Sequence, residues 1–430
     1  GKVQKMNDDR ILAVRDFITL ALTEVSEAQN LFHTSLLKSR KQTERVFLGT
    51  EVEAAMPWQT VDAEPLHAPS KLGHIYWFCN LILQAKSDGK EVVVCAGRDP
   101  EIITTCALLM GSYLILCENE PVDQVISAFQ PFDAHFVGYM DPSRSATVEL
   151  SIQDCWQALA CATRLGWVNI LDPSPDCDAC IDMEEYLHYD NAANGDLHVL
   201  VPSKLIAIRC PSEVTADQTT GEERLWADID GQRHFSASYY AEVLADFDVQ
   251  LVVRCGAQSY DEAAFVRRGM AVEELPVAEA GPHHLLSRID RFLTLANFAP
   301  GTIALHADGV GLGAAEVLVS AYLIRRHAFL ARAAVAWVRM VHPAAHVPGL
   351  RFSTHAARPA PPSAQQLARR NTIHEARRPT PPTTASAEEA APDDGAGGDA
   401  AAVPDRRHST PGVVLAPQPP APQAAEEAEE

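Results

Sequence analysis

The sequence has little positive charge. Its 430 residues include 35 lysines and arginines against 57 aspartates and glutamates, giving a formal net charge of −22. A protein that binds nucleic acid through a general basic surface needs the opposite balance, so the composition argues against that class. No apolar run reaches the ~20 residues of a membrane-spanning helix, and no signal-peptide pattern opens the sequence. We therefore expect a cytoplasmic or nuclear protein that binds neither nucleic acid nor membranes.

The ten cysteines lack the spacing of a disulfide framework. Most lie in or beside apolar runs, which is typical of buried free thiols in a reducing compartment. Cys177 and Cys180 form a lone CxxC pair near His188, whereas a structural zinc site needs four ligands. His283 and His284 are interpreted as the start of a helix rather than as ligands. We expect neither a metal nor another cofactor.

Apolar runs and turn signals divide the chain into five parts. Residues 1–59 form an N-terminal extension, in which the spacing from Ile11 to Leu37 predicts a helix. Two α/β units follow, each with a buried strand, a glycine-containing turn and an apolar helix. After residue 356, proline, alanine and acidic residues dominate, which predicts disorder. The expected parts are the extension 1–59, a first α/β domain 60–150, a helix and acidic linker 151–194, a second α/β domain 195–355 and the tail 356–430.

Residues 150–207 resemble the interdomain region of a known phosphatase family. They contain LSIQDCWQA at 150–158, EEYLHY at 184–189, NGDL at 194–197 and VPSKLIA at 201–207. The CDC-fourteen family of dual-specificity phosphatases has the similar patterns LxDCLxG, DEYxHY, NGD and VPGKF in the same order. The resemblance spans residues 60–355 and implies two tandem dual-specificity-phosphatase-like domains, of which the first is noncatalytic.

The resemblance also implies a particular chemistry. Members of the family hydrolyse phosphoesters through a cysteine thiolate, in a loop of His-Cys, five residues and Arg between a strand and a helix. Backbone N–H groups and the helix N-terminus hold the phosphate and lower the pKa of the thiol. The arginine grips two phosphate oxygens, and an aspartate on another loop protonates the leaving oxygen.

In this sequence the corresponding loop lacks the residues that perform the chemistry. It reads HADGVGLGA from His306 onward. His306 is retained, but Ala307 stands at the nucleophile position, and Gly313, or Ala314 if one residue is inserted, stands at the arginine position. Asp308 adds a negative charge, which disfavours a phosphate dianion. Ala307 has no sulfur to attack a phosphoryl group, and neither Gly313 nor Ala314 can grip one.

The general-acid loop departs from the family pattern as well. Ala278 stands where the family has aspartate, and the adjacent Glu279 is either a shifted acid or a solvated loop residue. The later loop, VPGLR at 347–351, lacks the glutamine that orients the attacking water. Three separate parts of the chemistry are therefore missing together, which predicts an inactive pseudophosphatase.

Two other interpretations of these loops are weaker. Cys95 also follows a strand and precedes a helix, but no arginine lies six positions later, so a buried structural thiol is favoured. The pattern Gly309-x-Gly311-x-x-Ala314 fits a permissive dinucleotide-binding loop. The acidic residue expected ~20 positions later is missing, because no Asp or Glu lies in 317–374.

The acidic linker indicates the kind of partner. In the family, linker carboxylates help to form a groove for a basic residue after a phosphoserine-proline, and Glu184, Glu185 and Asp190 match or nearly match those positions. Solvated acidic runs are the alternative. We expect a scaffold or binding protein for proteins or peptides, such as proline-directed phosphosites followed by basic residues. The alternatives are a weakly active phosphoserine/phosphotyrosine phosphatase, and a drifted copy or a sequence error at Ala307 and Gly313.

Overall fold

The computed structural model describes part of the chain in ten segments. The expected tail 356–430, Cys177 and the loop 347–351 lie outside them, and none of the described helices is both long and apolar enough to cross a membrane. The described segments are residues 10–36, 44–48, 68–139, 149–171, 180–214, 224–229, 231–256, 260–277, 282–308 and 312–342.

The N-terminal half is built on a four-stranded sheet with the order β1-β2-β4-β3. β1 (Ile11–Arg15) pairs with β2 (Ile18–Ala21) in antiparallel fashion, and β2 and β3 (Arg45–Leu48) pair with β4 (Glu91–Cys95) in parallel. A domain boundary at residue 60 passes between β3 and β4 of this one sheet. The segment before residue 60 therefore contributes strands to the same sheet as the segment after it.

The helix predicted from Ile11 to Leu37 is wrong in its first half. Only α1 (Val25–Leu36) is helical, whereas residues 11–21 form β1 and β2. A short apolar run fits both the helical and the strand period. Here the β-branched residues and the turn at Asp16 favour a hairpin, and pairing with β4 buries Ile18 and Leu20 completely.

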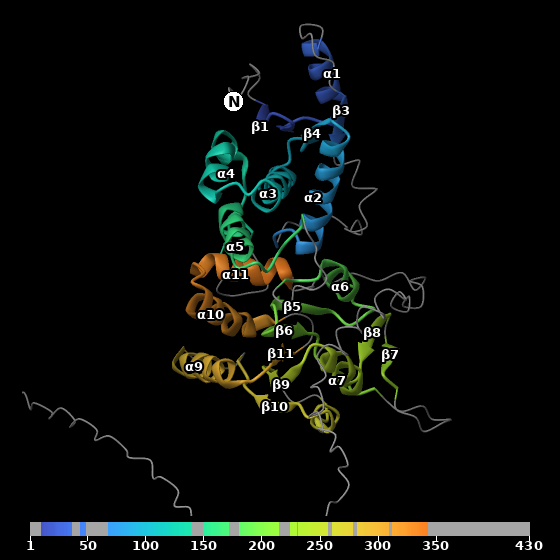
Figure 1. The fold of residues 1–430 in the computed structure, drawn as a ribbon, viewed down its shortest axis with the longest axis vertical. Helices are drawn as coiled ribbons and strands as arrows, with labels where there is room; N and C mark the ends of the chain where they lie inside the picture. The colour runs from blue at the N-terminus through green and yellow to red at the C-terminus, as the bar shows by residue number, and fades with distance from the viewer. Residues whose placement is uncertain are drawn as a thin grey trace, which may run out of the picture. The chain divides into compact units, whose positions relative to one another are not determined.

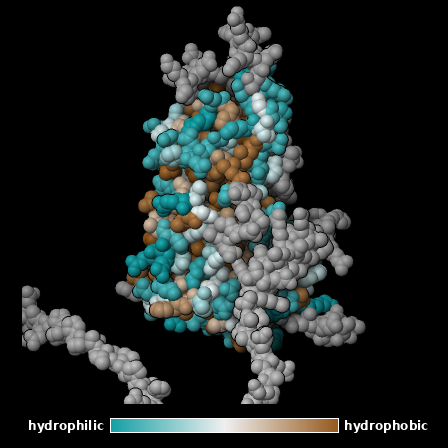
Figure 2. Space-filling view, viewed as in Figure 1, coloured by the Kyte–Doolittle hydropathy of each residue, from teal (hydrophilic) through white to brown (hydrophobic). Residues whose placement is uncertain are grey.

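Helices of the N-terminal half pack around this sheet and against one another (Figure 1). Asp99 accepts a hydrogen bond from Glu101 N at the start of α3, and Pro100 occupies its first position, so the sequence itself fixes this helix start. Apolar side chains gather over α2 and α3 on the face shown in Figure 2. The helices are α2 (Leu72–Ser87), α3 (Pro100–Leu116), α4 (Val122–Phe129) and η2 (Gln130–His135).

The second half is built on a five-stranded sheet with the order β10-β9-β11-β6-β5. Four strands are parallel, and β5 pairs antiparallel with β6 through the turn at Pro202 and Ser203. Residues Val249–Arg254 form β9 and residues Thr302–His306 form β11. The remaining strands are β5 (Leu197–Val201), β6 (Leu205–Ile208), β10 (Ala271–Glu274) and the separate hairpin β7 (Trp226–Ile229) and β8 (Gln232–Phe235).

Seven helices and one 3-10 turn complete the described part of the second half and the linker. Ser151 and Asp154 form a capping box at the start of α5, as the Ser-x-x-acid pattern favours. The elements are α5 (Ile152–Arg164), α6 (Met183–Tyr189), α7 (Ala237–Asp246), α8 (Ala263–Arg267), α9 (Pro282–Phe298), η3 (Gly313–Ala315), α10 (Glu316–His327) and α11 (Ala331–Val341).

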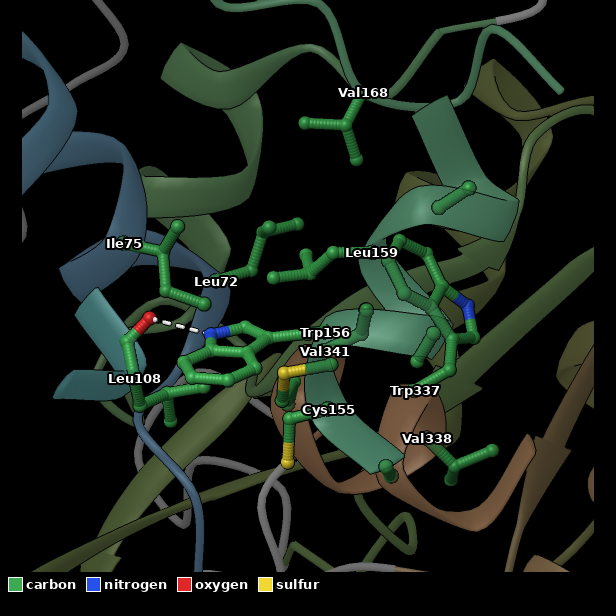
Figure 3. Close-up of a cluster of buried hydrophobic side chains, with 14 of the residues drawn as sticks. Leu72, Ile75, Leu108, Cys155, Trp156, Leu159, Val168, Trp337, Val338 and Val341 are labelled. Atoms are coloured by element: carbon green, nitrogen blue, oxygen red, sulfur yellow. Dashed lines mark hydrogen bonds between the residues drawn. The ribbon is translucent and has the colours of Figure 1, made fainter. Parts of the chain in front are cut away.

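One continuous hydrophobic core joins the two halves. Figure 3 shows Trp156 of α5 and Trp337 of α11 in the same cluster as Leu72 and Leu108 of the N-terminal half. The indole of Trp156 donates to Leu108 O at 3.1 Å, and that of Trp337 donates to Leu200 O at 2.9 Å. α5 thus packs between α3 and α11, and residues 1–376 form a single compact unit.

Candidate functional site

The centre of the candidate site is the end of strand β11. β11 is fully buried and lies between the parallel strands β9 and β6. Loops at the carboxyl ends of parallel strands are where α/β proteins place ligands. Ala307 follows the strand and is 9 % exposed, and the exposed Asp308 comes next. The next described segment begins at Leu312, and η3 leads from it into α10.

The two positions at which the resemblance places catalytic groups have no functional side chain in this chain. Ala307 presents a methyl group where the resemblance places a thiolate. Gly313, which the resemblance places at the arginine unless an insertion moves it to Ala314, has φ of 50° and begins η3. Nucleophilic attack needs a thiolate or a comparable group, and neither residue supplies one.

A cysteine does lie next to this strand end, but it is not activated. Cys255 leaves β9, and its N–H donates to His306 O at 2.8 Å. Its thiol donates to Val253 O at 3.9 Å. Burial raises the pKa of Cys255 to about 12. The thiol is therefore protonated at neutral pH and cannot replace the missing nucleophile.

The thiol of the N-terminal half is equally inert. Cys95 ends β4 and is 2 % exposed. Burial, with a smaller contribution from Glu24, raises the pKa of Cys95 to about 12. The burial and the raised pKa of Cys95 agree with the prediction of a buried structural thiol.

His306 belongs to a buried hydrogen-bonded group. Its Nε2 lies 2.7 Å from the hydroxyl of Tyr260. Burial lowers the pKa of His306 to about 4, and Arg254 acts in the same direction. The imidazole is thus neutral at physiological pH, and no titratable charge is retained at this position of the loop.

Arg254 is a guanidinium close to the strand end, but its side chain is fully buried. It pairs in register with His306 across the sheet. Its Nη2 donates to Glu262 at 3.0 Å, and its guanidinium lies 4.6 Å from the centre of the Tyr260 ring. No local pattern indicates this group, because the four residues come from β9, β11 and the segment between β9 and α8. Arg254 forms ion pairs with the exposed carboxylates of Glu262 and Glu274, while its Nε and Nη1 are buried without a hydrogen-bond partner among the described residues.

Asp308 packs closely against the neighbouring loop. A Cβ atom on Gly256 would lie 2.0 Å from Oδ1 of Asp308, so only glycine fits there without displacement. The Asp308 carboxylate therefore lies beside Gly256, at the carboxyl ends of β9 and β11. Its negative charge would repel a phosphate dianion at this end of the sheet.

The residues at the general-acid position lie outside the described segments. Ala278 and Glu279 follow Val277, whose N–H donates to Cys255 O at 3.1 Å. The described chain thus reaches the end of β9 just before them. Their roles as lost acid and shifted acid stay predictions.

The structure separates the three linker acids into two environments. Glu184 and Glu185 lie in the first turn of α6, where Asp182 accepts from both of their backbone N–H groups. Glu184 is exposed, and Glu185 borders a small hollow together with Tyr186. Favourable interaction with the helix dipole explains why acids are tolerated there.

Asp190 points into the protein instead. Its carboxylate accepts from His198 Nε2 at 2.9 Å and from Lys71 Nζ at 3.2 Å. Burial favours protonation of Asp190, but the hydrogen bonds from His198 and Lys71 outweigh it and hold its pKa well below the ordinary value. The structure brings Glu184 and Glu185 together and engages Asp190 in an internal ion pair.

Comparisons with known proteins agree on one class. A family model described as "Dual specificity protein phosphatase, N-terminal half" matches residues 26–162. Dual specificity protein phosphatase CDC14C of Homo sapiens is 24 % identical over 280 residues, covering 64 % of this chain and 58 % of that protein. The Tyrosine-protein phosphatase CDC14 homolog of Schizosaccharomyces pombe is 26 % identical over 333 residues, covering 73 % and 56 %. The chain spans about half the length of such relatives.

Solved structures add two matches with low scores. Tk-PTP in its active form has a TM-score of 0.25 and 15 % identity, covering 42 % of this chain and 97 % of that one. Human DUSP28 has a TM-score of 0.22 and 20 % identity, covering 38 % and 97 %.

The two sheets in tandem and the helix that follows β11 fit the dual-specificity phosphatase class that the family model describes. Within that class, the comparisons support similarity to the CDC14-type dual-specificity phosphatase family.

Proposed function

We propose that this protein is a pseudophosphatase, a phosphatase-like protein that binds phosphoproteins or peptides without hydrolysing them. The single observation that carries the proposal is the end of β11, where Ala307 and Gly313 replace a nucleophile and a phosphate-binding cation. The neighbouring Cys255 is too weakly acidic to substitute, and the buried Arg254 forms ion pairs with Glu262 and Glu274.

The relatives support phosphoproteins as partners, because they are dual specificity or tyrosine-protein phosphatases. The exposed Glu184 and the half-buried Glu185 supply negative charge at the start of α6, beside a hollow bordered by Tyr189 and Phe247. Negative charge of this kind favours a basic peptide residue. Asp190 does not contribute to this surface, because its carboxylate forms ion pairs with Lys71 and His198 rather than facing solvent.

Peptide binding tests this proposal. Peptides with Ser-Pro followed by Lys or Arg, phosphorylated and plain, are titrated against the full chain by fluorescence anisotropy. We expect the charge reversals Glu184→Lys and Glu185→Lys together to weaken binding by about tenfold or more, because attraction becomes repulsion. The loss should shrink at high salt, since exposed charges are screened.

A matched control keeps this result specific. The double variant Glu213→Lys and Asp290→Lys makes the same change in net charge at two exposed positions elsewhere. It should bind as the unmodified protein does. Equal loss in both double variants, or no binding of any peptide by the unmodified protein, would count against the proposed groove.

A further inference from the structure

A buried cluster of two histidines and two aspartates lies where the linker, the second sheet and α11 meet. Asp196 and His198 come from the start of β5, His342 ends α11, and Asp190 ends α6. Asp196, His198 and His342 are at most 5 % exposed. These residues are distant in sequence, and the fold brings them together away from the strand end of β11.

The two imidazoles face each other through the same atom type. Nδ1 of His342 lies 2.7 Å from Nδ1 of His198. Nε2 of His198 points the other way, 2.9 Å from Asp190 Oδ1. A carboxylate on one ring nitrogen fixes the proton there and leaves a lone pair on the other nitrogen. The lone pair of His198 is therefore directed at His342.

Hydrogen bonds within the cluster leave two atoms unsatisfied. Oδ2 of Asp196 and Nε2 of His342 are buried without a hydrogen-bond partner among the described residues. Oδ1 of Asp196 is 3.9 Å from His198 Nδ1, which is too far for a hydrogen bond. A proton shared between the two Nδ1 atoms would satisfy neither Nε2 of His342 nor Oδ2 of Asp196. A buried carboxylate oxygen without a hydrogen-bond partner is costly, so a further cation at this point would be strongly stabilising.

We propose that Asp196, His198 and His342 form a binding site for a divalent transition-metal ion of the zinc type. Each of the three residues offers one ligand atom, and these atoms lie within 4.8 Å of one another. Among the described residues, this trio of His and Asp side chains is close enough together to hold a metal ion. Two imidazoles and one carboxylate are a donor set that Zn²⁺ accepts, with a fourth position left for water or another small ligand. Asp190 acts as the outer partner that orients His198.

The site would act as a clamp between parts of the chain. Asp190 also binds Lys71, the residue that precedes α2 of the N-terminal half. Tyr186 of α6 donates to Val341 O at 2.9 Å, next to His342. A metal bound by β5 and α11, with α6 and α2 in its outer shell, would tie both halves and the linker together. This goes beyond the proposed peptide binding and does not depend on it.

Metal binding to the full chain tests the site. Protein stripped with a chelator is titrated with Zn²⁺ alone by calorimetry, and with Co²⁺ alone by visible absorption. We expect one strong equivalent per chain and a rise in Tm with Zn²⁺. Asp196→Asn and His342→Gln should each weaken binding by more than tenfold, and Asp190→Asn by about tenfold, as is usual for an outer partner.

Folding and competing sites are controlled separately. Asp196→Asn nearly preserves shape and removes an unpaired charge, so its Tm in chelator should match or exceed that of the unmodified protein. His284→Gln, on an exposed part of α9, and the pair Cys177→Ser with Cys180→Ser should leave Zn²⁺ affinity unchanged. The proposal is overturned if the unmodified protein binds no Zn²⁺, because a proton shared between His198 and His342 would then explain their contact. It is also overturned if Zn²⁺ binding persists in Asp196→Asn and disappears in the cysteine variant.

Discussion

At the scale of single residues, the carboxylate of Asp154 connects the capping of α5 with the packing of α11. It accepts from Ser151 and from Arg332 Nε at 3.0 Å. Burial favours protonation of Asp154, but the hydrogen bonds from Arg332 and Ser151 outweigh it and hold its pKa below the ordinary value. A group with a lowered pKa in the folded state stabilises the fold above its unfolded pKa.

Asp154→Asn therefore has a pH-dependent effect. At pH 7 we expect the variant to unfold at lower urea concentration than the unmodified protein, with a loss of about 1 kcal/mol from the weakened cap and ion pair. The difference should be constant down to about pH 4, the ordinary aspartate pKa, and should shrink below it as Asp154 becomes protonated. Asp290→Asn, at an exposed position, is the control; a difference independent of pH would contradict the assignment.

At the scale of elements, the contact between α3 and α5 depends on a glycine. A Cβ atom on Gly111 would lie 2.3 Å from Cε2 of Trp156. The indole thus fits against the helix backbone, where its N–H reaches Leu108 O. Trp156 packs with Phe129 of α4 at the same place, so three helices share this contact.

Gly111→Ala should consequently destabilise the protein. Alanine is favoured over glycine inside a helix by about 1 kcal/mol, but overpacking costs typically 1–3 kcal/mol, so we expect a net loss measured as a lower Tm. Gly73→Ala in α2 is the matched control, because its Cβ would approach closely only the end of the flexible Leu187 side chain and would meet the Tyr186 ring at 3.4 Å, an ordinary contact distance. Equal Tm changes in the two variants would show that the indole contact is unimportant.

The helices and strands also show which parts of the fold can be predicted from the sequence alone. Helix starts with a local signal, such as Ser151 or Asp99, and fully apolar strands such as β11 were predictable because their causes lie within a few residues. The hairpin at residues 11–21 was not, because pairing with the distant β4 decides it. The absence of cysteine and arginine from the loop after β11 is visible in the sequence. The cluster around Arg254 and the cluster of His198 and His342 could not be predicted, because they form only when distant strands and helices meet.

At the scale of the whole molecule, a continuous core surrounds the loop for which we propose a loss of activity. Trp156 and Trp337 lie in one core that continues from α3 to β5, so the second half is held in place by the first (Figure 3). Small side chains are compatible with this packing, since the buried Ala307 belongs to the core and Gly313 begins η3 beyond the end of the central strand β11.

Hydrolysis of an aryl phosphate by the purified full chain is the sharpest test of the proposed loss of phosphatase activity. We expect no turnover above that of a sample carrying Glu279→Gln or Asp308→Asn, at any pH from 5 to 8, because neither thiolate nor guanidinium meets the substrate at the end of β11. Saturable turnover by the unmodified protein that either substitution abolishes would contradict the account.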